Sequence, residues 1–227
     1  MSAVEAAGAA VVPHVKICCM LSVEEAHLAA RYGAWAIGLV SEMPSGPGPI
    51  PEERIVAIAA DAPAGVRRFL LTSLTSAEEI AAQQRRCGVD AVQLCDRPAA
   101  GAHEALRRAL PGVSLVQVIH VEGEDAVADA LDVAPRVDFL LLDSGRTRGP
   151  VRQLGGTGRA HDWSLSRRIV ERSPVPVFLA GGLRAENVAE AIRRVQPFGV
   201  DVCTGVRTDG KLDETKLAAF FAAVSGE

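Results

Sequence analysis

The sequence predicts an α/β protein built as a single (β/α)8 barrel, a TIM barrel. Short apolar runs rich in Val, Ile and Leu alternate with amphipathic stretches along the chain. The spacing from one apolar run to the next is about 22–37 residues, as parallel β-α-β crossovers require. Eight such units follow one another, and neither a linker nor a change of composition divides them.

Each unit consists of a strand followed by a helix. Continuous apolar runs such as residues 139–142 are typical of parallel strands that are buried on both faces. The strands are predicted at Val15–Cys19, Ala36–Ser41, Arg67–Thr72, Asp90–Cys95, Ser114–His120, Val137–Asp143, Val175–Ala180 and Gly199–Thr204. The helices are predicted at Val23–Tyr32, Pro51–Asp61, Ala77–Cys87, Ala102–Leu110, Asp125–Ala134, Ser164–Ser173, Ala185–Val195 and Glu214–Val224. A doubly wound open sheet is the competing fold, but no G-x-G-x-x-G motif follows the first strand.

The composition argues against several classes of protein function. The 227 residues are 48% hydrophobic and 23% charged with a net charge of -4, as in ordinary globular proteins. The acidic balance and the 4% aromatic content argue against nucleic-acid binding. No apolar run reaches the roughly 18 residues of a membrane span, and the N-terminal stretch lacks the basic residues of a signal peptide. We therefore expect a cytoplasmic protein with reduced thiols, an N-terminal extension at 1–13 and a barrel domain at 14–227.

The chemistry of such barrels takes place at the carboxyl ends of the strands. The residues predicted at these ends are Cys18, Cys19, Cys95, His120, Asp143 and Cys203. Packing is the alternative role for any single thiol, because free cysteine is a common core residue, and Cys87 at a helix end is expected to be structural. A carboxylate that ends an apolar strand must be hydrated, paired or functional, so Asp143 is the stronger candidate.

Glycine-rich turns follow the seventh and eighth strands. Gly181 and Gly182 precede a helix, and Thr204 and Gly205 follow the last strand. Backbone N–H groups approach a phosphate closely where side chains are absent, and a helix N-terminus favours the anion. Either turn alone has the alternative of being only a tight turn, but the pair predicts a phosphate site.

These residues resemble the phosphoribosylanthranilate isomerase family of tryptophan biosynthesis. The resemblance covers nearly the whole chain after Val15. Its matching segments are residues 15–18 (VKIC), 142–144 (LDS), 155–158 (GGTG) with 162–163 (DW), 179–183 (LAGGL), 186–188 (ENV), and 199–202 (GVDV) with 205–206 (GV).

The resemblance implies a (β/α)8 fold and an Amadori rearrangement that needs neither metal nor cofactor. It implies that Cys18 is the general base and Asp143 the general acid, and it places Asp201 with the phosphate-binding residues. The acid must begin protonated, which requires a raised pKa, and the base must be a thiolate, which requires a lowered pKa. Lys16 is not assigned as the partner of the thiolate, because a structural lysine is an equal interpretation.

The sequence departs from the family pattern mainly at the end that binds the aromatic carboxylate, so it is a divergent member. The family has an arginine after the second strand that anchors the anthranilate carboxylate, but residues 41–50 of this sequence contain no arginine. Arg146, Arg148 and Arg159 are candidates to replace it, with solvated loop charges as the alternative. At four further places the residues of this chain differ from those usual in the family. Cys19 stands where the family has Gly, Thr72 where it has Asn, Cys95-Asp96 where it has His-Gly, and Cys203-Thr204 with Arg207 where it has Ser-Ser with Glu.

Two functions follow as hypotheses. The first is the isomerase acting on a small phosphosugar, as a monomer or homodimer, with no nucleic-acid or membrane partner. The second is an isomerase-like barrel that binds a phosphosugar but has changed its substrate or lost its activity.

A zinc site is a further alternative. The four thiols at the strand ends and His120 are of the residue types that bind zinc, but their spacing matches no zinc motif. We expect no metal, and we expect Cys18 and Cys19 to face different sides because strand residues alternate.

Overall fold

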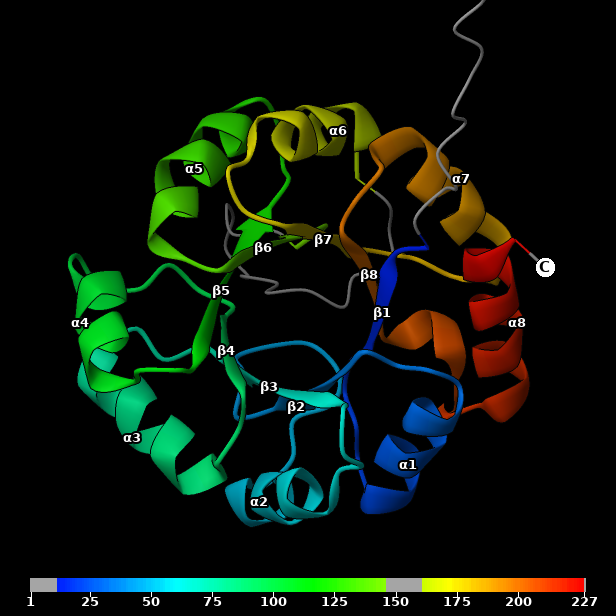
Figure 1. Cartoon of the computed structure of the whole chain (residues 1–227), viewed down its shortest axis with the longest axis horizontal. Helices are drawn as coiled ribbons and strands as arrows, with labels where there is room; N and C mark the ends of the chain where they lie inside the picture. The colour runs from blue at the N-terminus through cyan, green and yellow to red at the C-terminus, as the bar shows by residue number, and fades with distance from the viewer. Residues whose placement is uncertain (1–11, 146–160, 227) are drawn as a thin grey trace, which may run out of the picture.

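The computed structural model describes residues 12–145 and 161–226. Eight parallel strands close into a barrel in the order β1 to β8, and eight helices surround it (Figure 1). The strands are β1 His14–Ile17, β2 Ala36–Val40, β3 Arg67–Thr72, β4 Ala91–Leu94, β5 Ser114–His120, β6 Phe139–Asp143, β7 Val177–Leu179 and β8 Gly199–Val202. The predicted single (β/α)8 barrel is thus confirmed.

The helices follow the strands as predicted, with ends that differ by a few residues at most. They are α1 Val23–Arg31, α2 Glu52–Asp61, α3 Ala77–Cys87, α4 Ala102–Ala109, α5 Asp125–Val133, α6 Trp163–Arg172, α7 Ala185–Val195 and α8 Glu214–Ser225. At the start of several helices, the side chain of the N-cap residue accepts a hydrogen bond from the backbone of the first turn. Ser22 accepts a 3.3 Å hydrogen bond from the backbone of Glu25 in α1, and Asp213 accepts a 3.1 Å bond from Lys216 in α8.

Several strands end earlier than predicted. β1 ends at Ile17, β4 at Leu94 and β8 at Val202, so the cysteines at these ends lie in the loops rather than in the ladder. Four short elements were not predicted from the sequence: the hairpin strands β9 Arg207–Thr208 and β10 Lys211–Leu212, and the 3-10 turns η1 Ala134–Arg136 and η2 Thr204–Val206. These pieces are too short for periodicity to reveal them.

The first and last strands close the barrel. β1 pairs with β8 along its whole length, with Lys16 opposite Asp201 and Ile17 opposite Val202. Because side chains of neighbouring parallel strands at one level point to the same face, Lys16 and Asp201 both enter the barrel.

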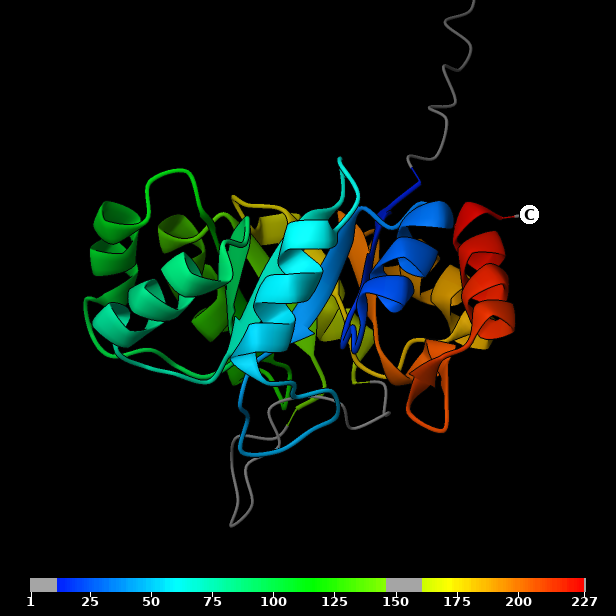
Figure 2. The same cartoon turned by 90° about the horizontal axis from the view of Figure 1, so that it is seen from below.

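Aromatic side chains close the end of the barrel where the strands begin. Trp35, Phe139, Phe178 and Phe198 have ring centroids 5.4–6.1 Å apart, and the guanidinium carbon of Arg67 lies 5.0 Å from the Trp35 ring. Figure 2 shows that the loops after β2 and β8 project together from one side of the barrel. Among the described residues, a cavity leads into the interior where the strands end.

No helix in the two described ranges is long and apolar enough to cross a membrane.

Candidate active site

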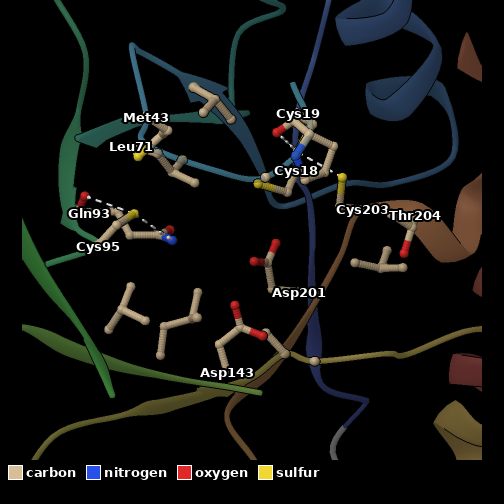
Figure 3. A pocket seen from close by; sticks show the side chains of 18 of the residues that line it. Cys18, Cys19, Met43, Leu71, Gln93, Cys95, Asp143, Asp201, Cys203 and Thr204 are labelled. Carbon is tan, nitrogen blue, oxygen red and sulfur yellow. Dashed lines mark hydrogen bonds between the residues drawn. The ribbon is translucent and has the colours of Figure 1, made fainter. Parts of the chain in front are cut away.

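A cavity lies at the carboxyl ends of the strands, and Figure 3 shows its side chains. They come from all eight strands or the loops that follow them. They include Cys18, Cys19, Val40, Met43, Ser45, Leu71, Gln93, Cys95, Val118, Leu141, Asp143, Gly181, Gly182, Asp201, Cys203 and Thr204. The fold thus brings together the predicted catalytic pair, Cys18 and Asp143, with four of the five predicted phosphate-binding residues. Gly205 does not line the cavity, and neither does His120.

Cys18 follows the last residue of β1 and is held by the closure of the barrel. Its backbone N–H donates a 2.8 Å hydrogen bond to the carbonyl of Val202 in β8, and its side chain is buried. The pKa of Cys18 lies below its usual value because a side-chain hydrogen bond with Cys19 favours the thiolate, and the nearby Lys16 cation adds to this effect against the opposing cost of burial. A lowered pKa is what a thiolate base needs.

The expectation that Cys18 and Cys19 face different sides is wrong, since both line this cavity. Alternation holds only inside a strand, and β1 has already ended. Cys19 also has a φ of 64°, in the left-handed region that side chains other than glycine rarely adopt. This backbone turn brings the second thiol to the same side as the first.

Lys16 is fully buried and donates a 2.9 Å hydrogen bond from Nζ to Oδ1 of Asp201. Although burial alone would lower the pKa of Lys16, the Asp201 carboxylate raises it well above its usual value, so the lysine stays charged. This ion pair argues against Asp201 as a phosphate ligand. A carboxylate offers no hydrogen to a phosphate and repels it, and this one already accepts from Lys16. Asp201 lines the same cavity as Cys18 and Asp143, with its carboxylate held by Lys16.

Asp143 ends β6 and pairs in register with His120 of β5. Its Oδ1 accepts a 2.7 Å hydrogen bond from the backbone N–H of Ser144. Burial raises the pKa of Asp143 above the ordinary carboxyl value, and the nearby Asp201 raises it further. A raised pKa is what a general acid needs. Figure 3 shows the Asp201 carboxylate between Asp143 and Cys18 in this view.

The loops after β7 and β8 are packed backbone against backbone. A Cβ atom on Gly205 would lie 2.0 Å from the carbonyl oxygen of Leu183, so only glycine permits this contact. Gly181 has a φ of 85°, and a Cβ there would lie 2.9 Å from Oγ of Ser144. Gly205 therefore supports the glycine-lined edge of the cavity from behind, whereas Gly181, Gly182 and Thr204 form that edge.

The role of Arg207 was not predicted from the sequence. Its side chain is buried and bonds to the carboxylate of Glu25 at 3.0 Å, to the carbonyl of Gly210 at 2.9 Å and to the carbonyl of Cys19. Glu25 in turn accepts from the backbone N–H of Leu21 at 3.0 Å. The guanidinium thus ties the loop after β8 to the loop that carries both thiols. The only sign of this role in the sequence was that Arg207 stands where the family usually has a glutamate.

The opposite wall of the cavity is apolar and is formed by Val40, Met43, Leu71, Val118 and Leu141. Gln93 is 3% exposed there, and its Oε1 has no hydrogen-bond partner. In the part of the chain that the structure describes, no lysine or arginine lines this wall. The proposed replacements Arg146, Arg148 and Arg159 lie outside the described residues, as does the GGTG segment at 155–158.

Within 12–145 and 161–226, no three His, Cys, Asp or Glu side chains gather so that they would hold a metal ion. Nε2 of His120 lies 3.0 Å from the carbonyl oxygen of Cys95 instead.

A closed (β/α)8 barrel with a buried thiol, a buried carboxyl and a glycine-lined edge in one cavity belongs to the class of barrel enzymes that act on small metabolites. Within this class, the family model described as N-(5'phosphoribosyl)anthranilate (PRA) isomerase matches residues 71–223. The chain belongs to this family. It is an isomerase of tryptophan biosynthesis that carries out an aldose–ketose Amadori rearrangement.

Relatives and solved structures agree with this assignment. The chain is 39% identical to N-(5'-phosphoribosyl)anthranilate isomerase of Haloferax volcanii, covering 92% of this chain and 91% of the relative. It is 36% identical to N-(5'-phosphoribosyl)anthranilate isomerase 2 of Methanosarcina mazei, with 91% of each covered. The crystal structure of phosphoribosyl anthranilate isomerase from Thermotoga maritima matches with a TM-score of 0.80 and 30% identity, over 95% of this chain and 100% of that one. Another isomerase structure, in complex with reduced 1-(o-carboxyphenylamino)-1-deoxyribulose 5-phosphate, matches with a TM-score of 0.78 and 28% identity, over 95% and 100%.

Proposed function

We propose that Asp143 and Cys18 are the acid and the base of the rearrangement of N-(5'-phosphoribosyl)anthranilate. The Asp143 carboxyl protonates the ring oxygen of the ribose, and the ring opens to an iminium. The Cys18 thiolate then removes the proton from C2' to give the enolamine, which tautomerises to the 1-deoxyribulose product. The single observation that carries this proposal is that Asp143 and Cys18 line one cavity at the carboxyl ends of the strands. Burial, which raises the pKa of Asp143, and the neighbours of Cys18, which lower the pKa of that thiol, fit the two roles.

Lys16 supports the base electrostatically in this proposal. Its cation faces both Asp201 and Cys18, so it favours the thiolate without taking part in proton transfer. Asp201 keeps Lys16 charged, and its negative charge near Asp143 helps that carboxyl to stay protonated. The Lys16–Asp201 ion pair therefore favours the thiolate of Cys18 through its cation and the protonated carboxyl of Asp143 through its anion.

The substrate would lie with its phosphate at the glycine-lined edge and its aromatic ring on the apolar wall. Gly181 and Gly182 would approach the phosphate with their backbone, and Thr204 would donate its hydroxyl. Gly205 would keep the two loops together. The unpartnered Oε1 of Gln93 is available to accept a hydrogen bond from the substrate.

We also infer a cytoplasmic enzyme that works without a cofactor, as a monomer or a homodimer. The five free cysteines fit a reducing compartment.

The test of the acid–base pair is the loss of substrate fluorescence on turnover. Cys18→Ser and Asp143→Asn are each expected to lower kcat at least ~100-fold, the usual worth of a positioned proton transfer. Cys87→Ala is the matched control, because this thiol is buried at the end of α3, away from the cavity. Turnover close to wild type in either catalytic variant would remove that residue from the mechanism.

The phosphate site has a separate test. Inorganic phosphate is expected to inhibit competitively, and Thr204→Val is expected to raise KM and weaken this inhibition while kcat changes little. Inhibition that is unchanged in Thr204→Val would place the phosphate elsewhere.

A further inference from the structure

Two thiols face each other across the seam between the first and last strands. Cys19 follows β1 and Cys203 follows β8, and their sulfur atoms are 2.7 Å apart although 184 residues separate them in sequence. Both line the cavity, where Cys19 is 5% exposed and Cys203 is more open to solvent. The dashed line between them in Figure 3 marks this contact. A disulfide bond is about 2.05 Å long, so the two sulfurs are within an ångström of bonding distance.

The backbone on both sides of this thiol pair is fixed. The N–H of Cys18 donates a 2.8 Å bond to the carbonyl of Val202, immediately before Cys203. Arg207 donates to the carbonyl of Cys19 from the loop that begins at Cys203. The sulfur atoms are therefore held close by main-chain contacts, and bond formation needs little movement of either loop.

We propose that Cys19 and Cys203 are a redox-active pair that a hydroperoxide converts reversibly into a disulfide, and that this disulfide weakens the neighbouring catalytic base. The pair is placed in the cavity mouth, where a small oxidant reaches Cys203 first. Only the effect on catalysis rests on the proposed role of Cys18, while disulfide formation does not.

The oxidation balances in two steps. The deprotonated sulfur of Cys203 attacks the O–O bond of the hydroperoxide; an S–O bond forms, and the leaving alkoxide takes up a proton to become an alcohol. The sulfur of Cys19, after losing its proton, attacks the resulting sulfenic acid; the S–S bond forms, and the released hydroxide becomes water. The two thiols together lose two electrons and two protons, and the hydroperoxide is reduced. A dithiol reductant reverses the change.

Cys18 is the chain neighbour of Cys19 and lines the same cavity, so a new bond at the Cys19 sulfur changes the surroundings of the Cys18 sulfur. The Cys19 thiol, whose hydrogen now lies within reach of the Pro47 carbonyl, favours the Cys18 thiolate; the disulfide removes that hydrogen, and the pKa of Cys18 rises. The other charged or titratable groups that face Cys18 remain in place; they are Lys16 on β1, Cys95 after β4, Asp201 on β8 and Arg207 on the following loop. A smaller thiolate fraction at neutral pH then slows proton removal from C2'.

The experiment compares reduced protein with protein treated with hydrogen peroxide. Wild type is expected to lose two of its five titratable thiols, to become lighter by two hydrogen atoms, and to yield one linked peptide pair containing Cys19 and Cys203. Dithiothreitol should restore all five. Cys203→Ser should form no disulfide, and Cys87→Ala, the matched control, should still form it.

Two functional readouts follow on the same samples, each variant being compared with its own reduced form. The pKa of Cys18, taken from the pH dependence of its alkylation by iodoacetamide, should rise by about one unit on oxidation. Turnover at a pH below this value should fall about tenfold, since one pKa unit changes the thiolate fraction tenfold. Cys203→Ser should show neither change.

Retention of all five thiols, or a linkage that involves Cys18 instead of Cys203, would overturn the proposed pair. A Cys19–Cys203 disulfide that leaves the alkylation pKa of Cys18 unchanged would overturn the proposed effect on the base. If that pKa rises while turnover does not fall, the pair stands and it is the role of Cys18 as base that fails.

Discussion

Replacing Lys16 by methionine tests the centre of the site most directly. Methionine keeps the length and apolar stem of the side chain but removes the charge. Lys16 is 0% and Asp201 8% exposed, so neither charge is screened by solvent. The variant leaves the Asp201 carboxylate buried without its partner. Breaking a buried pair in this way costs about 3–5 kcal/mol, and we expect the free energy of unfolding to fall by that amount at neutral pH.

The loss of stability should depend on pH with a definite sign. Burial already raises the pKa of Asp201, and without Lys16 it rises further. The folded variant then binds a proton that the unfolded chain releases, so its stability increases as the pH is lowered from neutrality towards the ordinary carboxyl pKa of about 3.9. Urea unfolding followed by the fluorescence of Trp35 and Trp163, repeated over this pH range, measures both effects.

The double variant Lys16→Met/Asp201→Asn is the control. It removes both charges, so most of the lost stability should return although the ion pair is still absent. A destabilisation of Lys16→Met below about 1 kcal/mol, as for an exposed pair, would show that the charges are solvated and that the reasoning is wrong. Equal destabilisation of the single and double variants would refute the uncompensated-charge argument.

Three further predictions concern other parts of the site. Gly205→Ala should raise KM, because the added Cβ would collide with the carbonyl of Leu183; an unchanged KM for the substrate would contradict this. Arg207→Met should lower the free energy of unfolding by about 3 kcal/mol in a urea titration, because it leaves Glu25 nearly buried and unpaired, and Arg207→Lys should restore part of the loss. The carboxyl of Asp143 should titrate above 3.8 in carbon-13 NMR spectra because it is buried, and a pKa at or below 3.8 would contradict its assignment as the acid.

The sequence predicted the barrel well because its signals are local. Apolar runs such as that of β6, and amphipathic helices between them, carry the periodicity of each element within about ten residues. The placement of Cys18, Asp143 and Cys95 at one end followed from the parallel direction of the strands.

What the sequence could not predict depends on the closure of the barrel or on backbone angles. The contacts of Lys16 with Asp201 and of Cys19 with Cys203 join residues more than 180 positions apart. Nothing in the local sequence of β1 indicates which residue of β8 will stand opposite. The left-handed turn at Cys19 was missed because cysteine has no preference for that conformation, and the alternation rule was applied beyond the end of the strand.

The seam between β1 and β8 also sets when the site comes into being. During synthesis the ribosome makes Lys16 and Cys18 before six further strands, and Asp201 and the loop after β8 only once all of these have been made. A nascent chain without β8 would have a lysine without its carboxylate partner, and its glycine-lined edge would lack Thr204 and the support of Gly205. The complete site therefore exists only in molecules whose β1 and β8 have paired, and activity reports the fraction of such molecules.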